Sequence, residues 1–211
     1  MIKHNFTISE IFNSAWTKTK EHAWFLFRTF LALGVIAGIS SFIPIFSSIV
    51  DFFIGIALIA VSLVIVRGGT PTLDDFTKSF KTAKIFWHYV LATLLFILII
   101  VLGFIALVLP GIYLATRLQF YRYLIVDNQS MGPVEALKKS MEMTKGHFWK
   151  LFGFIVVIIL FNILGALLLL VGLLITIPVS VLACTYLYER LLITPAHHDN
   201  VTHHADAETV A

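Results

Sequence analysis

The sequence predicts an all-α, polytopic membrane protein with six transmembrane helices, built as three repeats of an amphipathic interfacial helix plus a helical hairpin. The first basis is composition: 59% of the 211 residues are hydrophobic, 13% are charged, and the mean hydropathy is +0.93. Soluble domains usually hold roughly 45–50% apolar residues. The second basis is that long runs, such as residues 90–109, carry no charge. A bilayer is therefore the expected solvent for this chain.

Each of six apolar segments approaches the roughly 17–25 residues that a helix needs to cross the hydrocarbon core. Proline or glycine lies in or near the turn that follows the first, third and fifth segments, as expected for hairpin turns. In the first segment, Gly34 and Gly38 form a Gly-x-x-x-Gly pair, which predicts a close helix contact. The predicted spans are 24–43, 47–66, 86–109, 111–126 (the shortest), 149–171 and 173–192.

Basic residues are confined to alternate connections between these segments. The three hairpin turns contain no lysine or arginine, whereas the other connections and the two ends hold Lys18, Arg67, Lys138 and Arg190 among others. By the positive-inside rule, both termini are predicted to be cytoplasmic. Tryptophans near the predicted cytoplasmic ends, such as Trp24 and Trp149, fit interfacial anchors.

An internal repeat is the third basis of the fold prediction. Residues 19–27 align without gaps on residues 144–152 at an offset of 125, and a weaker middle copy places Phe76 on Phe12 and Leu137. This periodicity predicts repeated helical units at about 7–66, 72–127 and 133–194. They form a single six-span membrane domain, 1–194, and residues 195–211 are predicted to be a disordered cytoplasmic tail.

Each repeat is expected to begin with an amphipathic helix. Residues 7–10 and 72–75 fit a capping box, and Pro133 is suited to a first helical position. Apolar residues then recur on one face, with charges opposite, which predicts helices in the inner headgroup plane. Two roles stay open for them: sensing lipid, or stabilising the entry to each hairpin.

Arg117 is the deepest ionisable residue of the predicted spans. It precedes Asp127 by ten residues, which is about 15 Å along a helix at 1.5 Å per residue. Tyr113 and Tyr121 share its face, and Arg122 lies nearer the interface. One hypothesis is a packing arginine that bonds backbone carbonyls or Asn162; the other is an anion site for a phosphate or carboxylate headgroup. The candidate ligand-binding residues are Arg117, Arg122, Tyr113, Tyr121 and Asn162.

Several function classes are disfavoured. Asp51 falls near an outer turn, so no acidic residue is expected within the membrane, which argues against proton or cation pumping. The sequence lacks the known hydrolase, metalloprotease and phosphate-loop motifs, so we expect no enzyme and no cofactor. We expect no metal site either, although the histidines of the tail allow one as an alternative. The scattered basic residues form no stripe that would suit nucleic acid.

Two functions remain. The first is a non-enzymatic integral membrane module that organises or senses inner-leaflet lipid, with anionic phospholipid as a candidate, or a partner membrane protein, which includes a second copy of the chain. The alternative is a transporter of an anionic or lipid substrate that uses Arg117. A cavity that reaches Arg117 would favour transport, and a closed bundle with surface grooves would favour the module.

The second half of the chain resembles a known group of proteins. Residues 109–113, Arg117, 126–127, 136–140 and 144–146 are similar to the pattern of YciC-like inner-membrane proteins and of the membrane domain attached to some glycerophosphoryl diester phosphodiesterases. This resemblance implies a multi-pass protein of the prokaryotic cytoplasmic (inner) membrane that works near phospholipid headgroups. The catalytic domain of the fused phosphodiesterases has no counterpart here, and no functional residue can be transferred.

Overall fold

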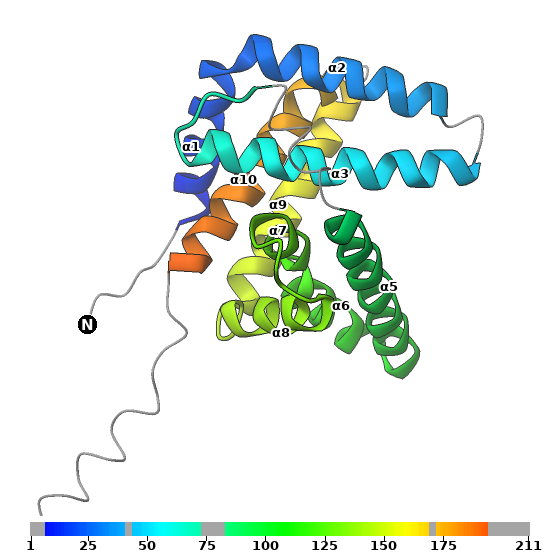
Figure 1. Cartoon of the computed structure of the whole chain (residues 1–211). Coiled ribbons are helices and arrows are strands. Elements are labelled where there is room, and N and C mark those ends of the chain that lie inside the picture. Colours follow the sequence, from blue (N-terminus) through cyan, green and yellow to red (C-terminus); the bar gives the residue numbers. More distant parts are fainter. Residues whose placement is uncertain (1–6, 41–43, 73–82, 169–171, 194–211) are drawn as a thin grey trace, which may run out of the picture.

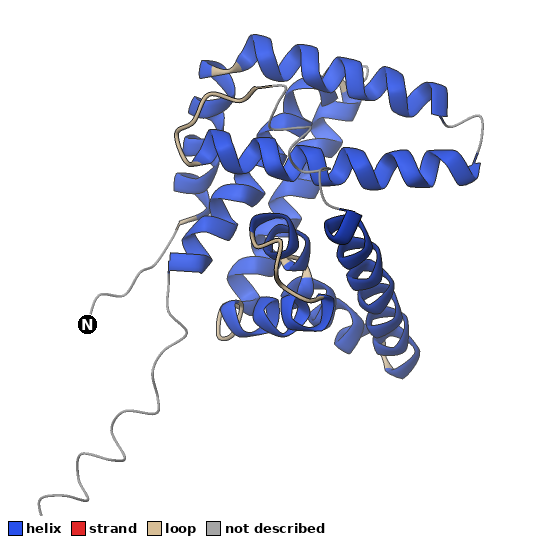
Figure 2. Cartoon of the chain, viewed as in Figure 1, coloured by secondary structure: helices blue, strands red, loops and turns tan. Residues whose placement is uncertain are grey.

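The computed structural model describes residues 7–40, 44–72, 83–168 and 172–193. All regular secondary structure within these ranges is helical (Figures 1 and 2). The middle amphipathic segment, residues 73–82, and the predicted tail lie outside them. The helices are α1 (Ile8–Glu21), α2 (Ala23–Ser40), α3 (Pro44–Val66), α5 (Ala83–Ala106), α6 (Val108–Leu118), α7 (Tyr121–Asp127), α8 (Pro133–Met143), α9 (Phe148–Leu167) and α10 (Leu173–Ile193).

Four segments of the described chain are long and apolar enough to cross a membrane: Ala23–Ser40, Ile85–Ile105, Phe148–Leu167 and Leu173–Ile193. A shorter apolar stretch, Val50–Val66, belongs to α3. These segments confirm an all-helical chain and indicate a multi-pass membrane protein. They match the first, third, fifth and sixth predicted spans.

The fourth predicted span, 111–126, is not one continuous helix. It is divided between α6 and α7, which are separated at residues 119 and 120. The turn before it also differs from the prediction, because the extended backbone lies at Leu107 (φ −172°, ψ 152°) and not at Pro110. Pro110 falls in the first turn of α6, where its missing N–H costs no hydrogen bond.

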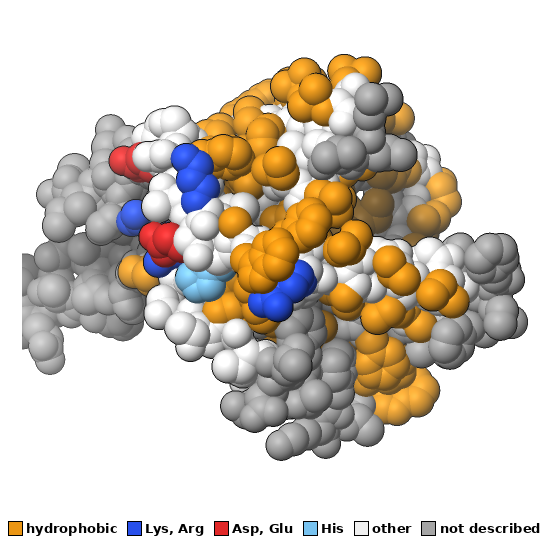
Figure 3. Space-filling view, turned by 90° about the horizontal axis from the view of Figure 1, so that it is seen from above, with side chains coloured by type: hydrophobic (Ala, Val, Ile, Leu, Met, Phe, Trp, Pro, Cys, Tyr) orange, Lys and Arg blue, Asp and Glu red, His pale blue; other side chains and the backbone are white. Residues whose placement is uncertain are grey.

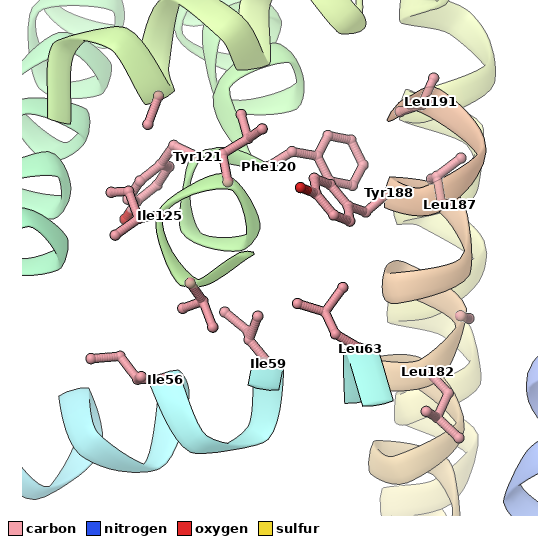
Figure 4. Packing of buried hydrophobic residues seen from close by; sticks show 14 of the residues in the cluster. Ile56, Ile59, Leu63, Phe120, Tyr121, Ile125, Leu182, Leu187, Tyr188 and Leu191 are labelled. Carbon is pink, nitrogen blue, oxygen red and sulfur yellow. The ribbon is translucent and has the colours of Figure 1, made fainter. Parts of the chain in front are cut away.

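Helix α10 lies at the centre of the fold. It packs against α1, α2, α3 and α9, and half of its apolar span is buried, against 11% of the span of α2. Helix α7 fills the space between α10 and α3. Figure 4 shows α7 end-on, with Phe120 beside Tyr188 of α10 and with Ile59 and Leu63 of α3 directed toward it. The two halves of the chain are therefore joined by a common apolar core.

Large hydrophobic side chains cover much of the outer surface. In the face drawn in Figure 3 they dominate, and charged side chains gather toward one side. Ile105, Leu109 and Leu167 are each about three-quarters exposed, at 75%, 78% and 74%. Exposed apolar area costs roughly 25 cal/mol per Å² in water, so this surface fits hydrocarbon. Trp24 and Trp149 are also exposed and each is the second residue of its helix.

The two described amphipathic helices turn their apolar faces toward other helices. Ile11 and Ala15 of α1 are buried, and α1 packs against α10. Ala136 and Leu137 of α8 are buried, and α8 packs against α5 and α7. Contact with protein thus accounts for their amphipathic pattern. Of the two roles that the sequence leaves open, this packing favours stabilisation of the hairpin entry.

Helix starts in the two halves of the chain coincide at the offset seen in the sequence. Helix α1 begins at Ile8 and α8 at Pro133, and α2 begins at Ala23 and α9 at Phe148. His22 and His147, which precede the second helix of each pair, have nearly the same backbone angles (φ −110°, ψ 20° and φ −110°, ψ 14°). The ends of the first helices differ, because α1 continues to Glu21 whereas α8 ends at Met143 and Gly146 has a φ of +80°. The aligned segments 19–27 and 144–152 therefore share their helix starts but not the turn between the helices.

Close helix approach occurs at the hairpin turns and not in the first span. A Cβ atom added to Gly111 would lie 2.7–2.9 Å from ring atoms of Phe104, and one added to Gly172 would lie 2.9 Å from the Cα atom of Gly165. At Gly34, by contrast, no atom of the described chain lies within 4 Å of such a Cβ. The contact predicted at Gly34 is therefore absent from this part of the chain, because α2 lies at the edge of the bundle.

Candidate functional site

The guanidinium of Arg117 is occupied by contacts within the protein. One terminal nitrogen donates a hydrogen bond to the hydroxyl of Tyr113 at 2.7 Å, and the other donates to the backbone carbonyl of Met141. The Nε atom lies 3.4 Å from the hydroxyl of Thr144. Arg117 thus contacts Tyr113, as the sequence predicts, and closes the C-terminal end of α8, where a cation is favoured by the helix dipole.

The contact between α6 and α8 is reciprocal. The hydroxyl of Ser140 donates to the backbone carbonyl of Arg117 at 2.9 Å, and the hydroxyl of Thr144 lies 3.2 Å from the same oxygen. Ser140 and Thr144 are fully buried. Carbonyls at a helix end lack partners within the helix, so α8 satisfies the carbonyl that α6 exposes where it stops. These hydroxyls explain how the fourth span is interrupted without glycine or proline at the break.

Three of the other candidate residues lie away from Arg117. The amide of Asn162 donates to the hydroxyl of Ser180 at 2.7 Å and to the carbonyl of Ile158, which ties α9 to α10. The hydroxyl of Tyr121 donates to Thr93 of α5 at 2.9 Å. The predicted site therefore divides: Arg117 and Tyr113 lie at the end of α8, Asn162 lies between α9 and α10, and Tyr121 and Arg122 lie beside α5.

Arg122 lines an open cavity between α3, α5 and α7. Its Nε atom donates to the hydroxyl of Tyr121 at 3.0 Å, and its guanidinium carbon lies 5.6 Å from the centre of that ring. Within the described residues, neither of its terminal nitrogens has a hydrogen-bond partner. The cavity has a volume of about 320 Å³ and is lined by Asp51, Phe52, Gly55, Tyr89, Thr93 and Arg122.

The same cavity contains an acidic residue that sequence reasoning set aside. Asp51 is the eighth residue of α3, two turns from the helix start at Pro44. In the described chain its carboxylate makes no hydrogen bond or ion pair, so it does not pair with Arg122 across the cavity. The cavity therefore presents two opposite charges that are not neutralised by each other.

A second charged cluster joins the ends of three helices. Arg67, which follows α3, donates to both carboxylate oxygens of Asp127 at 2.7 and 2.8 Å and to Glu189 at 2.7 Å. Tyr188 of α10 donates to the same carboxylate of Asp127 at 2.9 Å. These bonds hold the guanidinium in its charged form and raise the pKa of Arg67. The sequence places all three ions at the same ends of their spans, but not in contact.

The described residues contain no group of three or more histidine, cysteine, aspartate or glutamate side chains that would suit a metal ion. The histidines of the predicted tail lie outside this part of the chain. The chemistry of the site is thus that of charged and hydroxyl side chains, which suits binding of a polar ligand by hydrogen bonds and ion pairs.

Comparison with known proteins adds one match. No curated protein and no solved structure matches the chain, so the resemblance to YciC-like proteins and to phosphodiesterase membrane domains remains an expectation. Just under half of the chain matches a family model. Residues 97–194, which include Arg117 and Arg122 but not Asp51 or Arg67, are similar to the family described as "Protein of unknown function (DUF975)".

Proposed function

We propose that the chain is a non-enzymatic integral membrane module that binds the phosphate group of a lipid headgroup through Arg122. The observation that carries this proposal is that the terminal nitrogens of Arg122 have no partner in the described residues although the side chain lines an open cavity. A guanidinium offers paired donors that match two phosphate oxygens. Cationic donors left without a hydrogen-bond acceptor near a bilayer are costly, so lipid phosphate is a natural partner for these two nitrogens.

Arg117 is assigned a different role from the one that the anion hypothesis gives it. Its donors are directed to Tyr113, Met141 and Thr144, so a phosphate would have to displace bonds that close a helix end. We therefore assign Arg117 to packing, which was the other hypothesis for this residue. Arg122 keeps the anion-binding role.

The proposed orientation puts the Arg67 cluster and both termini on the cytoplasmic side of a prokaryotic inner membrane. The basic residues lie in alternate connections of the sequence, and this orientation places those connections on the cytoplasmic side. Arg122 precedes Asp127 by five residues, about 7.5 Å along a helix. The arginine would then lie close to the Arg67 cluster along the chain. In this arrangement α6 and α7 together form the fourth of six spans, and the shared starting positions of α1–α2 and α8–α9 support a repeated unit.

The experiment is a measurement of the phospholipid that copurifies in mild detergent, quantified per protein by mass spectrometry. Arg122→Gln should lose most of the bound phospholipid, whereas Arg117→Gln should keep it while melting at a lower temperature. Lys138→Gln is the matched control, because Lys138 is exposed on α8 and has no partner among the described residues. Equal amounts of bound phospholipid per protein in wild type and in Arg122→Gln would exclude the proposal.

Transport of a small polar solute is a second candidate. It is favoured by the interruption of the fourth span next to the cavity, because broken helices often form transporter binding sites. The cavity involves Arg122 and not Arg117, so a transporter would use the former. Uptake of a solute by proteoliposomes, abolished by Arg122→Gln, would favour transport over a static binding module.

A further inference from the structure

The cavity beside Arg122 has charges of both signs, which a purely anionic ligand would not use. Asp51 comes from α3 and Arg122 from α7, and both line the same space of about 320 Å³. No ion pair joins them in the described part of the chain, so their charged atoms are not in direct contact. The space between them is open and remains accessible to a ligand.

Such an arrangement leaves both charges available to a ligand. Charged side chains within a membrane protein normally pair with one another, with backbone groups or with water. Elsewhere in this protein that rule holds, since Arg67 binds Asp127 and Glu189 directly. Among the described residues, the carboxylate of Asp51 and the terminal nitrogens of Arg122 have no such partner and line the same cavity, which points to a ligand that carries both complementary charges.

We propose that this cavity binds a zwitterionic phosphoethanolamine group, with its phosphate at Arg122 and its ammonium at Asp51. The inference rests on the proposed function and names the ligand class of that site. An anionic headgroup, such as phosphoglycerol, would satisfy Arg122 with its phosphate but has no cation to pair with Asp51. The zwitterion can neutralise both residues, because it carries a negative and a positive charge in one group.

Hydrogen bonding favours a primary ammonium over a quaternary one. Asp51 accepts hydrogen bonds, and the hydroxyl of Tyr89 has no hydrogen-bond partner in the described residues. The other hydroxyl of the cavity is already used, because Thr93 donates to the carbonyl of Tyr89 and accepts from Tyr121. A primary ammonium has three donors, which suit the carboxylate and the hydroxyl. A choline group has no N–H donor and would leave both acceptors unused.

Gly55 keeps this part of the cavity open. A Cβ atom at this position would lie 3.0 Å from the hydroxyl oxygen of Tyr89. That distance is shorter than ordinary van der Waals contact, so a side chain would press on the hydroxyl and fill the space next to it. Glycine therefore leaves the hydroxyl accessible to a ligand on the α3 side of the cavity.

The test compares lipid binding by native mass spectrometry in detergent. Wild type is offered equal amounts of phosphatidylethanolamine, phosphatidylglycerol and phosphatidylcholine, and should bind the first about tenfold more than the others. Asp51→Asn should bring the ratio of phosphatidylethanolamine to phosphatidylglycerol to about one. Arg122→Gln should lose both, and Lys138→Gln should behave as wild type. Tyr89→Phe, which removes a single hydroxyl, should lower the preference about threefold even if Asp51→Asn folds poorly.

The outcomes separate the two proposals. If Arg122→Gln loses both lipids but Asp51→Asn keeps the wild-type ratio, the zwitterion inference is wrong and headgroup binding stands. If Arg122→Gln keeps both lipids, both proposals are wrong. Equal binding of phosphatidylcholine by wild type would overturn the ammonium contact. If soluble O-phosphoethanolamine displaces the bound lipid at the same concentration as the lipid, the natural ligand is a soluble zwitterion. If only the diacyl lipid displaces it, the natural ligand is a membrane lipid.

Discussion

Removing Arg67 should reveal how strongly the ends of three helices are joined. The substitution Arg67→Met keeps most of the hydrocarbon chain but removes hydrogen bonds to Asp127 and Glu189. The carboxylates that lose their partner are only 19% and 18% exposed, while the arginine side chain is 46% exposed. The cluster is thus neither fully buried nor at the open surface.

The exposure of the three side chains sets the expected magnitude. Exposed ion pairs contribute about 0.2–1 kcal/mol, and removal of one partner of a buried pair costs about 3–5 kcal/mol. Because the arginine is nearly half exposed, solvent screens it, and a value between these limits follows. We expect Arg67→Met to lower the free energy of unfolding by about 2 kcal/mol, with about 1 kcal/mol of coupling to Asp127.

A double-mutant cycle measures this coupling. The four proteins are wild type, Arg67→Met, Asp127→Asn and the double variant, each unfolded by titration of a denaturing detergent into mixed micelles. The control cycle uses Lys18 and Glu21, which form a surface pair at 2.6 Å on α1 with side chains 30% and 48% exposed. Coupling at Arg67–Asp127 no larger than in this control would refute the reasoning that the cluster holds α3 to α7.

Two further predictions concern packing and topology. Gly111→Ala should lower the free energy of unfolding by about 1–3 kcal/mol, because its Cβ would overlap the ring of Phe104. Gly34→Ala should be neutral or should stabilise the protein by up to about 1 kcal/mol. If thermal melts show that both variants lose the same stability, the described packing is contradicted. For topology, Ser130→Cys in a Cys184→Ala background should not react with an impermeant thiol reagent added outside intact cells, since the connection between α7 and α8 is proposed to be cytoplasmic. Labelling from outside would show that this connection faces the outside and would contradict the proposed orientation.

The helices and their ends follow from the sequence because local signals specify them. Apolar length predicts α2, α5, α9 and α10, and the capping residues mark the start of α1 and α8: the backbone N–H of Thr7 donates to Glu10 at 3.2 Å, and that of Gly132 lies 3.4 Å from Glu135. These interactions join residues three apart in the chain. Such signals are visible in a single sequence.

The interruption between α6 and α7 has no comparable local signal. Residues 119 and 120 include neither glycine nor proline, and the hydroxyls that satisfy the carbonyl of Arg117 come from Ser140 and Thr144, more than 20 residues later. Which helix supplies them depends on how α6 and α8 pack. The prediction of one uninterrupted fourth span therefore failed for a tertiary reason.

The candidate site was only partly predictable for the same reason. Hydropathy identifies Arg117 and Arg122 as unusual charges, but it cannot say which of them has its donors occupied. That depends on the end of α8 for Arg117 and on α5 and α3 for Arg122. Asp51 lies two turns from the start of α3 at Pro44, which agrees with its predicted place near a turn, but the sequence does not show that it lines a cavity together with Arg122.

The measurement that tests the central claim most directly is photocrosslinking with a phosphatidylethanolamine that carries a diazirine next to its headgroup. Peptide mapping should place the crosslink on the cavity-lining residues of α3, α5 and α7, around 51–55, 89–93 and 122. Arg122→Gln should abolish it, and Arg117→Gln should leave it in place. A crosslink on α1 or α8 that Arg122→Gln leaves unchanged would contradict the account, because the lipid would then be bound by the amphipathic helices and not by the cavity.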